Sequence, residues 1–278
     1  MTEQAKVWRS PVLTNLEVLH ATYRTHTFPR HVHEEFCIGI IISGVEAVKY
    51  RGETHIAPTG SIVVLQPDEG HSNWAAVDAG WSFKVIYPPT YLFQPWFNRN
   101  DQQPLSVPFF ANPVIRDRPL FQQLAQFHCR LEQSTMSDRM ELETRLLTIL
   151  QTLVARHAID KAANKHTDKP DHQLVQKIKR YLHTYYCQNL TLEDLSNFCD
   201  RSPFHLNRIF RESVGLPPHA YLTHIRIAHA KSRLSQSSSL AQLAVELGFN
   251  DQSHFTKTFK AWVGVTPGQY RAQLKAEL

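Results

Sequence analysis

The last hundred residues of the chain alternate hydrophobic and polar positions with helical spacing, and the pattern occurs twice. Hydrophobic side chains recur every three or four residues in short segments at 191–200, 202–214, 240–247 and 251–263. Six positions of the first copy, from His205 to Tyr221, recur as the same residue types 49 positions later, from His254 to Tyr270. An interval of this length holds two short helices and a connector, so the pattern predicts two helix-turn-helix units.

The predicted helices of both copies are bounded by residues that suit helix ends. Thr191 and Asp194 have the spacing of a capping box, and Ser202 precedes a proline that would occupy the first turn of its helix. Gly215 and Gly264 follow the second helix of each copy, where a left-handed cap favours glycine. These signals occur where two helix-turn-helix units need them.

Helical spacing also separates inward from outward side chains in the second helix of each copy. The inward side chains are Leu206, Ile209 and Phe210 in the first copy, and Phe255, Phe259 and Trp262 in the second. The outward side chains combine amide, hydroxyl and cationic groups: Ser202, Phe204, His205, Asn207, Arg208 and Arg211, then Gln252, Ser253, His254, Lys257 and Lys260. Such groups bind base edges and phosphates. Either set alone is typical of a solvated helix face, but the duplication favours DNA contact.

The first hundred residues have a different pattern, with short runs of β-branched and aromatic residues. Runs at 36–43, 46–51, 61–66 and 81–87 are typical of strands. Turn-forming residues separate them at 43–44, 51–52, 58–60 and 67–70. Many short strands at this spacing predict a β-barrel or a double-sheet jelly roll.

Two helical patterns follow, at about 119–133 and 138–156. The second carries one apolar stripe at helical spacing: Leu142, Leu146, Ile149, Leu150 and Leu153. The stripe has two explanations, which a wide stripe could satisfy together. It packs on the barrel, or it forms a helix–helix contact between two copies of the chain.

Composition and charge support a division into two domains. With 278 residues, of which 42% are hydrophobic, the chain can form two ordinary cores. Residues 171–278 carry 13 lysine and arginine against 8 aspartate and glutamate, whereas residues 1–170 carry 17 of each. The whole positive excess therefore lies in the helical part, where it supports attraction to phosphate without establishing it.

Several other classes of protein are not favoured. The N-terminus lacks an apolar run typical of a signal peptide, and no segment approaches the ~20 apolar residues of a membrane span. The cysteines are scattered, at Cys37, Cys129, Cys187 and Cys199. This scatter argues against a zinc ribbon, a disulfide framework and the cysteine cluster of an alkyl-transfer repair sensor. We therefore expect a protein of a reducing cytoplasm.

The segment 244–271 resembles the signature of the AraC/XylS family of bacterial transcription regulators almost throughout, and the resemblance extends over about 171–278. It implies two units in successive major grooves, joined by a long helix at 218–234. Matched by position, it implies base contacts from Phe204, Asn207 and Arg208, and from Gln252, Ser253, His254 and Lys257. Arg208 has the fork that pairs with guanine, whereas Asn207 and Gln252 suit adenine. Lys257 lacks that fork.

Residues 10–90 resemble the cupin-type sensor domain that precedes the DNA-binding domain in many of these regulators. The likeness rests on the segments His-Val-His-Glu-Glu-Phe at 31–36 and Pro-Asp-Glu-Gly-His at 67–71. Effector pockets of this kind are lined by aromatic residues and a few polar groups. The candidate effector-binding residues are therefore His31, His33, Phe36, His71, Trp81 and Phe83. Trp81 and Phe83 are equally compatible with core positions. Residues 80–88 look like a subgroup often associated with amino-acid exporters, so the predicted effector is an amino acid or a related metabolite.

His31, His33 and His71 also raise the possibility of a metal site, since imidazoles are common ligands. The enzyme-type cupin pattern has a glutamate a few residues after the paired histidines, whereas Cys37 and Ile38 stand near that position here. We therefore predict no metal and no other cofactor. A metal-dependent cupin enzyme, or a metal sensor fused to a DNA-binding domain, remains the alternative.

The sequence thus predicts an α+β protein of two domains. Residues 1–158 form a cupin-like β-barrel with a helical dimerisation element, residues 159–172 a linker, and residues 173–278 an all-α domain with two helix-turn-helix units. The predicted function is sequence-specific transcription regulation in response to a small-molecule effector, without enzymatic activity. The predicted partners are double-stranded DNA, the effector, a second copy in a homodimer, RNA polymerase if the protein is an activator, and no membrane.

Overall fold

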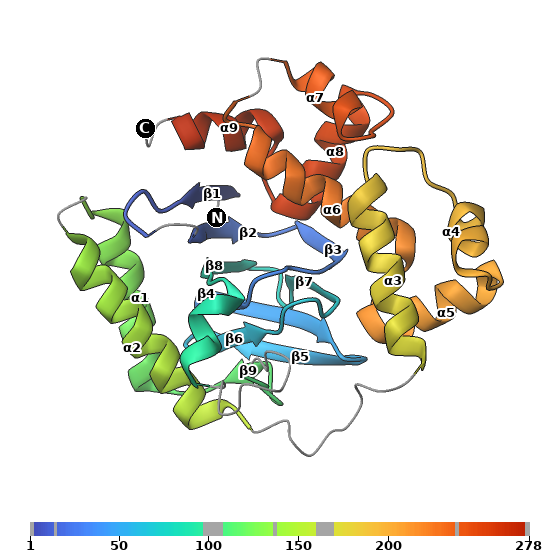
Figure 1. The fold of residues 1–278 in the computed structure, drawn as a ribbon. Helices are drawn as coiled ribbons and strands as arrows, with labels where there is room; N and C mark the ends of the chain where they lie inside the picture. Colours follow the sequence, from blue (N-terminus) through green and yellow to red (C-terminus); the bar gives the residue numbers. More distant parts are fainter. Residues whose placement is uncertain are drawn as a thin grey trace.

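A computed structural model describes residues 3–13, 16–96, 108–135, 138–159, 170–236 and 239–275. Their elements form three groups: a β-structure, two helices along one side of it, and a C-terminal set of helices on the opposite side (Figure 1). Most of the predicted linker, at 160–169, lies outside the described residues.

The N-terminal part is an antiparallel β-structure. Its elements are β1 (Gln4–Arg9), β2 (Glu17–Tyr23), β3 (Thr27–His31), β4 (Cys37–Tyr50), β5 (Glu53–Pro58), β6 (Ile62–Leu65), β7 (His71–Ala75), β8 (Trp81–Tyr87), the 3-10 helix η1 (Thr90–Trp96) and β9 (Val114–Ile115). One path of paired strands runs β1-β2-β8-β4-β6-β9, while β7 pairs with both β3 and β4 and β5 pairs with β4. Every pairing among the described strands is antiparallel, in agreement with the predicted barrel class.

β4 is longer than the sequence predicts. The expected turn at Ser43 and Gly44 is absent from the described strand, which continues through both residues. Gly44 has a φ of +76°, and the pairing with β8 shifts register between Ile41 and Ser43. A glycine in this conformation bends the strand instead of ending it. The first half of β4 therefore pairs with β6 and β8, and the second half with β5 and β7.

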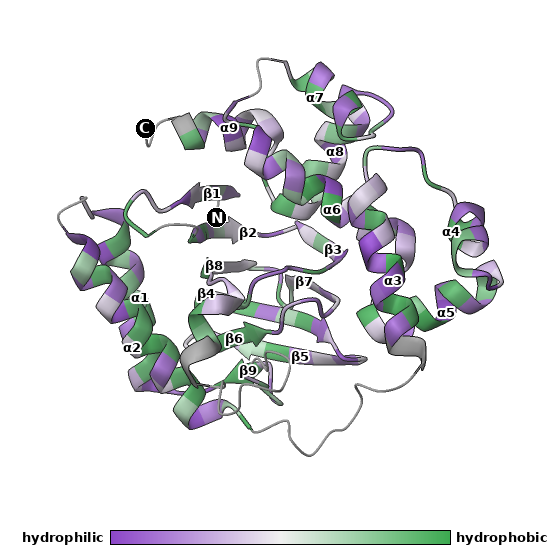
Figure 2. Ribbon diagram, in the orientation of Figure 1, coloured by the Kyte–Doolittle hydropathy of each residue, from purple (hydrophilic) through white to green (hydrophobic). Residues whose placement is uncertain are grey.

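Other predicted turns and strands agree with the structure. Arg51 and Gly52 have φ values of 51° and 89°, as a tight hairpin between β4 and β5 requires. The strand predicted at 81–87 is β8, and that predicted at 61–66 contains β6, whose residues are all buried and appear as a hydrophobic run in Figure 2. The sequence did not predict six further strands: β1, β2, β3, β5, β7 and β9. In all of them except the two-residue β9, polar residues are mixed with apolar ones.

The helices α1 (Arg118–Glu132) and α2 (Arg139–His157) lie side by side along one face of the barrel (Figure 1). All five residues of the predicted leucine stripe are buried, none more than 4% exposed. They share a core with Phe36, Ile38 and Phe93 from the barrel side. Packing within the chain therefore accounts for the stripe.

The C-terminal helices are α3 (Pro170–Tyr185), α4 (Leu192–Cys199), α5 (Pro203–Val214), α6 (Pro218–Arg233), α7 (Leu240–Glu246), α8 (Gln252–Val263) and α9 (Pro267–Lys275). The predicted caps are present. The Thr191 side chain and Asp194 form a reciprocal capping box on α4, and Ser202 caps α5 by accepting from the amide of His205. Gly215 and Gly264 end α5 and α8 in the left-handed conformation, with φ values of 80° and 90°.

The barrel and the second helix-turn-helix unit share one hydrophobic core. Val7 and Leu19 of the barrel belong to the same buried cluster as Phe255 and Tyr270 of the helical part. The first unit has a core of its own, to which the barrel contributes Val32. Burial of apolar surface therefore holds α9 against β1, and α6 and α8 against β3.

Candidate effector cavity and DNA-reading helices

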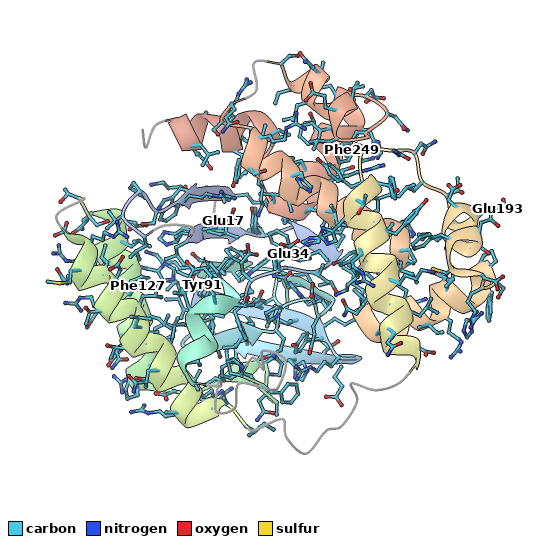
Figure 3. All side chains as sticks on the ribbon, viewed as in Figure 1. Glu17, Glu34, Tyr91, Phe127, Glu193 and Phe249 are labelled. Carbon is cyan, nitrogen blue, oxygen red and sulfur yellow. The ribbon has the colours of Figure 1, made fainter. Side chains whose placement is uncertain are left out.

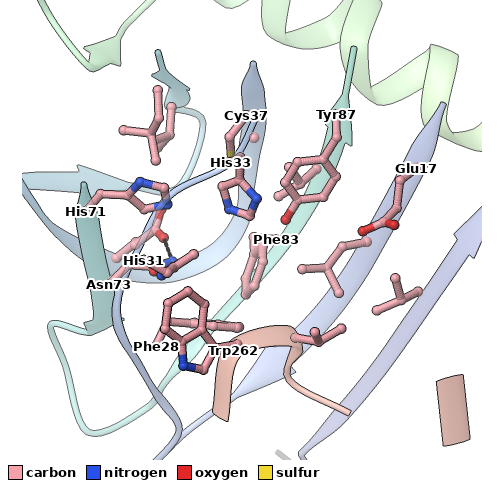
Figure 4. A pocket seen from close by; sticks show the side chains of 18 of the residues that line it. Glu17, Phe28, His31, His33, Cys37, His71, Asn73, Phe83, Tyr87 and Trp262 are labelled. Atoms are coloured by element: carbon pink, nitrogen blue, oxygen red, sulfur yellow. Dashed lines mark hydrogen bonds between the residues drawn. The ribbon is translucent and has the colours of Figure 1, made fainter. Parts of the chain in front are cut away.

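A cavity of about 50 Å³ lies inside the barrel and is closed at one end by the helical domain. Strands β2, β3, β4, β6, β7 and β8 supply most of its wall (Figure 4). Lys231 of α6 and Trp262 of α8 complete it from the other domain. Both domains therefore contact anything bound in this cavity.

Three histidines form a cluster in the cavity wall. His31 ends β3, His33 follows it, and His71 begins β7, directly opposite His31 in the strand register. The ring centroids of His31 and His71 are 4.2 Å apart, and His33 lies 4.9 and 5.2 Å from them. Burial lowers the pKa of His71 to about 4 and holds the pKa values of His31 and His33 well below the ordinary value. All three imidazoles are therefore neutral at pH 7.

Two of these rings are fixed by backbone carbonyls. The Nδ1 of His31 lies 2.7 Å from the carbonyl oxygen of Pro29, and the Nδ1 of His71 lies 3.1 Å from that of Glu69. A carbonyl only accepts, so each Nδ1 carries the proton and donates it. In the neutral ring, Nε2 then carries no proton and presents a lone pair.

Acidic and amide groups face the same cavity. Glu46 of β4 is buried and accepts a hydrogen bond of 2.8 Å from the side-chain amide of Asn73. Its burial raises the pKa of its carboxyl to about 7. Cys37 also lines the wall, and burial raises the pKa of its thiol. The cavity therefore offers donors, acceptors and a carboxyl that titrates near neutrality.

The predicted pocket residues divide into two groups. His31, His33, His71 and Phe83 line the cavity. Phe36 and Trp81 do not belong to the lining. Phe36 points to the opposite side of the barrel wall, where it packs on Phe93, and Trp81 is buried behind Phe83 with their rings stacked at 5.5 Å.

The cavity residues that the sequence did not suggest come from distant segments. They include Glu17 of β2, Glu46 and Asn73 in the barrel, and Lys231 and Trp262 in the helical domain. No motif marked the first four of these residues, whereas the sequence predicted an inward core position for Trp262. The docking of α6 and α8 on the barrel places Lys231 and Trp262 there.

A second, larger cavity of about 210 Å³ lies between the two domains next to the first. Its wall includes Glu34, Glu35, His224 and Lys231, and both cavities share Glu17 and Trp262. Glu17 and Glu34 lie between the β-structure and the C-terminal helices in Figure 3. The two cavities together form a polar space across the domain interface.

Glu17 is the central polar contact of this interface. Its Oε1 lies 2.5 Å from Nζ of Lys231, and its Oε2 accepts a hydrogen bond of 3.0 Å from the hydroxyl of Tyr270. Gln273 of α9 adds two hydrogen bonds to the backbone of β1. On the other side of the interface, Lys179 pairs with Asp68 at 3.1 Å. The two domains are thus joined by specific polar contacts as well as by the shared core.

The helices α5 and α8 expose the residues predicted to read DNA. Phe204 is 79% exposed. Gln252, Ser253, His254 and Lys257 are exposed on the first turns of α8, whereas His205 and Asn207 of α5 are half-buried. Arg208 is exposed and pairs with Glu212 at 3.2 Å on the same helix.

The last basic residues of the two predicted sets, Arg211 and Lys260, are exposed and also lie near the barrel. Burial lowers the pKa of His26 in the barrel, and the nearby charge of Lys260 adds to this lowering. Burial likewise lowers the pKa of Arg30, and the charge of Arg211 adds to this lowering. Trp262 faces the barrel cavity, although its spacing predicts an inward position with Phe255 and Phe259. α8 packs against β3, and this contact gives it a second buried side.

Together, a barrel with an internal cavity and a basic domain with two helix-turn-helix units define a transcription regulator that responds to a small molecule. Two family models match the chain: the AraC-like ligand binding domain over residues 13–150, and a helix-turn-helix domain over residues 195–273. The chain belongs to the AraC/XylS family of transcription regulators.

Individual relatives agree with this assignment. An HTH-type transcriptional regulator of Bacillus subtilis, YbfI, is 29% identical over 82% of this chain and 81% of its own length. The transcriptional activator RhaR of Yersinia pseudotuberculosis is 26% identical over 90% of this chain and 86% of its own length. A crystal structure of apo ToxT from Vibrio cholerae has the same fold, with a TM-score of 0.60, 16% identity and coverage of 98% of this chain and 97% of that one. Among the described residues, no helix is long and apolar enough to cross a membrane.

Proposed function

We propose that the chain binds DNA through α5 and α8 and that a small carboxylate-bearing effector in the interdomain cavities controls this binding. The observation that carries the proposal is the shared wall: Lys231 and Trp262 belong to the DNA-binding domain, yet they close the sensor's cavity. An effector that binds there contacts both domains at once. It therefore distinguishes domain arrangements, as any ligand must in order to shift an equilibrium between them.

The charges of the cavities suit a zwitterion such as an amino acid. Lys231 supplies a cation for a carboxylate, and Glu46, with its pKa near 7, supplies an acceptor for an ammonium group. The internal cavity of about 50 Å³ has room for only a few water molecules. An amino acid must therefore also use the adjoining space of about 210 Å³ between the domains.

This geometry suggests how binding acts on the DNA-binding domain. Lys231 is held by Glu17, so an effector carboxylate that takes Lys231 competes with the interdomain ion pair. Loss of that pair weakens the docking of α6 and α9 on β2. The second helix-turn-helix unit then becomes free to adopt the spacing that two major grooves require.

We infer that the base contacts come from the first turns of both helices. We assign this role to Phe204, Asn207 and Arg208 on α5, and to Gln252, Ser253, His254 and Lys257 on α8. Ser202, His205, Arg211 and Lys260 are proposed to contact phosphates. Arg208 must exchange its ion pair with Glu212 for a guanine or a phosphate, an exchange that costs little for an exposed pair.

Footprinting of the full chain on genomic DNA tests the proposed readers. Arg208→Ala and Lys257→Ala each remove one proposed contact, and we expect each to weaken one of two contacts spaced about one helical turn apart. The loss per variant should be about 1–3 kcal/mol. Arg139→Ala is the matched control, because Arg139 is an exposed arginine on α2. Footprints insensitive to both variants would show that the helices do not read bases.

Calorimetry with a panel of amino acids tests the effector site. We expect binding of one molecule per chain that is weakened at least tenfold by Lys231→Met. Lys49→Met, which removes an exposed lysine from β4, should leave it unchanged. If no acid binds, or if both variants bind equally, the effector is of another class or binds elsewhere.

We further propose that the protein acts as a homodimer in the bacterial cytoplasm, without enzymatic activity and, as an activator, in contact with RNA polymerase. Because the leucine stripe of α2 is used within the chain, the dimer contact must use another surface. The opposite face of α2 exposes Met140, at 80%, and Leu147, at 42%. Light scattering of Leu147→Glu checks this surface, and an unchanged dimer mass excludes it.

A further inference from the structure

We propose that His31, His33 and His71 bind one divalent transition-metal ion inside the barrel, with an open coordination position directed into the effector cavity. The inference deepens the proposed function, since the ion would share the cavity assigned to the effector. A small-molecule effector with a carboxylate or amine would then complete the coordination.

The three imidazoles are close enough to share one ion. Each residue offers a ring nitrogen, and all three nitrogens lie within 4.8 Å of one another. In a tetrahedral zinc site with metal–nitrogen distances of 2.0–2.1 Å, neighbouring nitrogens are ~3.3 Å apart. Shifts of roughly 1 Å or less in the rings bring the set to that geometry. No other group of histidine, cysteine and acidic residues in the described part of the chain meets the same criterion.

The hydrogen bonds of the cluster orient the lone pairs as a metal requires. Pro29 and Glu69 accept the Nδ1 protons of His31 and His71. Metal-binding histidines commonly donate their other ring N–H to a backbone carbonyl in this way, which fixes the tautomer and the ring orientation. Both Nε2 atoms are thereby left as acceptors. Among the described residues no hydrogen bond joins the three rings, so the cluster does not satisfy itself.

The size of the internal cavity also favours an ion. About 50 Å³ is too small for an amino acid but suits a metal with one or two water molecules. Three nitrogen ligands with an exchangeable fourth position are the arrangement of zinc sites that bind small molecules. Among the described residues, no cysteine or carboxylate belongs to the cluster with the three histidines, so the fourth position is open to an external ligand.

The site is connected to the DNA-binding domain. Trp262 of α8 lies with its ring 6.0 Å from that of His31, and His224 of α6 stacks on Trp262 at 6.3 Å. Reorientation of His31 upon metal binding therefore acts on a side chain that α8 inserts at the domain interface. Occupancy of the ion can change how tightly the two domains dock.

Titration of the chelator-treated full chain with Co²⁺, followed by visible absorption, tests the site. We expect one Co²⁺ per chain, with the absorption of a low-symmetry nitrogen site, and displacement by Zn²⁺. His71→Gln and His33→Gln should each weaken binding by at least 100-fold. His55→Gln is the matched control, because His55 lies on β5 outside the cluster. Zn²⁺ should raise the melting temperature of the wild type and the control but not of the cluster variants.

Two results would overturn the inference: the absence of a stoichiometric Co²⁺ spectrum in the folded wild type, or equal affinities in the cluster variants and the control. The wild-type titration decides the matter even if a variant fails to fold. Calorimetry with amino acids in the presence of chelator separates this inference from the proposed function. Effector binding that survives chelation with unchanged affinity leaves the proposed function standing and removes the metal from it.

Discussion

Glu17 on β2 and Lys231 on α6 form an ion pair of 2.5 Å across the interface between the sensor and the DNA-binding domain, although 214 residues separate them in sequence. Neither side chain is more than 18% exposed. Removing one partner of this partly buried pair leaves the other charge uncompensated. Because both residues also line the cavities, a change in cavity occupancy acts directly on a contact between the two domains.

Weakening this pair should loosen the interface. We expect Glu17→Gln to raise DNA affinity in the absence of effector by about tenfold, equivalent to about 1.4 kcal/mol, because the docked arrangement loses stability relative to the free one. Gel-shift titration measures the change. Glu193→Gln, which removes the same charge from an exposed position on α4, is the control for simple electrostatics. Equal effects of the two variants would assign the gain to net charge.

The glycine that ends α8 is required by both its conformation and its surroundings. Gly264 has a φ of +90°, and a Cβ placed there would lie 2.1 Å from the hydroxyl oxygen of Tyr23. We expect Gly264→Ala to lower the free energy of unfolding by about 2 kcal/mol or more, from backbone strain and displacement of Tyr23. In contrast, Gly268→Ala on α9 meets no atom within 4 Å and should be neutral or slightly stabilising. Urea denaturation compares the two.

The buried carboxyl of Glu46 should make stability depend on pH. Its pKa is raised from 4.5 to about 7 by burial, so the folded state binds its proton more tightly than the unfolded chain does. The stability from this protonation is complete below about pH 4.5 and is lost as the pH rises to about 7. Glu46→Gln removes the titration and still accepts from Asn73. The variant should gain on the order of 2–3 kcal/mol over the wild type at pH 8 and little at pH 5.

Chemical denaturation of metal-free protein at the two pH values measures this difference. Glu53→Gln on β5, where the side chain is exposed, is the control and should show no pH-dependent gain. A constant offset between Glu46→Gln and wild type at both pH values would mean that Glu46 is ionised throughout.

The leucine stripe of α2 should behave as core. Leu150 is fully buried and Leu147, three residues earlier, is 42% exposed. We expect Leu150→Ala to cost about 2–5 kcal/mol and Leu147→Ala less than about 1 kcal/mol. Thermal denaturation of both variants at several protein concentrations measures the costs. Equal destabilisation by the two substitutions at every protein concentration would contradict the assignment of Leu150 to the core and of Leu147 to the surface.

The sequence alone determined much of this protein, because the decisive signals are local. The recurrence of His205 and Phe210 as His254 and Phe259, with caps at Thr191, Ser202 and Gly264, predicted two helix-turn-helix units within one or two residues. Hairpin residues such as Arg51 and Gly52 predicted a turn of the barrel. Helix caps and tight turns depend on a few neighbouring residues, and so they can be predicted from the sequence without a structure.

Only the tertiary structure decided how the cavity is built. Glu17 and Lys231 carry no local signal, and the spacing of Trp262 predicted only an inward core position. These three residues meet because the two domains dock through a shared core. The continuation of β4 through Gly44, and the burial of the α2 stripe within the chain, were likewise decided by long-range packing. A strand or a helix buries its apolar side against whichever surface the rest of the chain presents. The spacing of apolar residues along the sequence does not identify that surface.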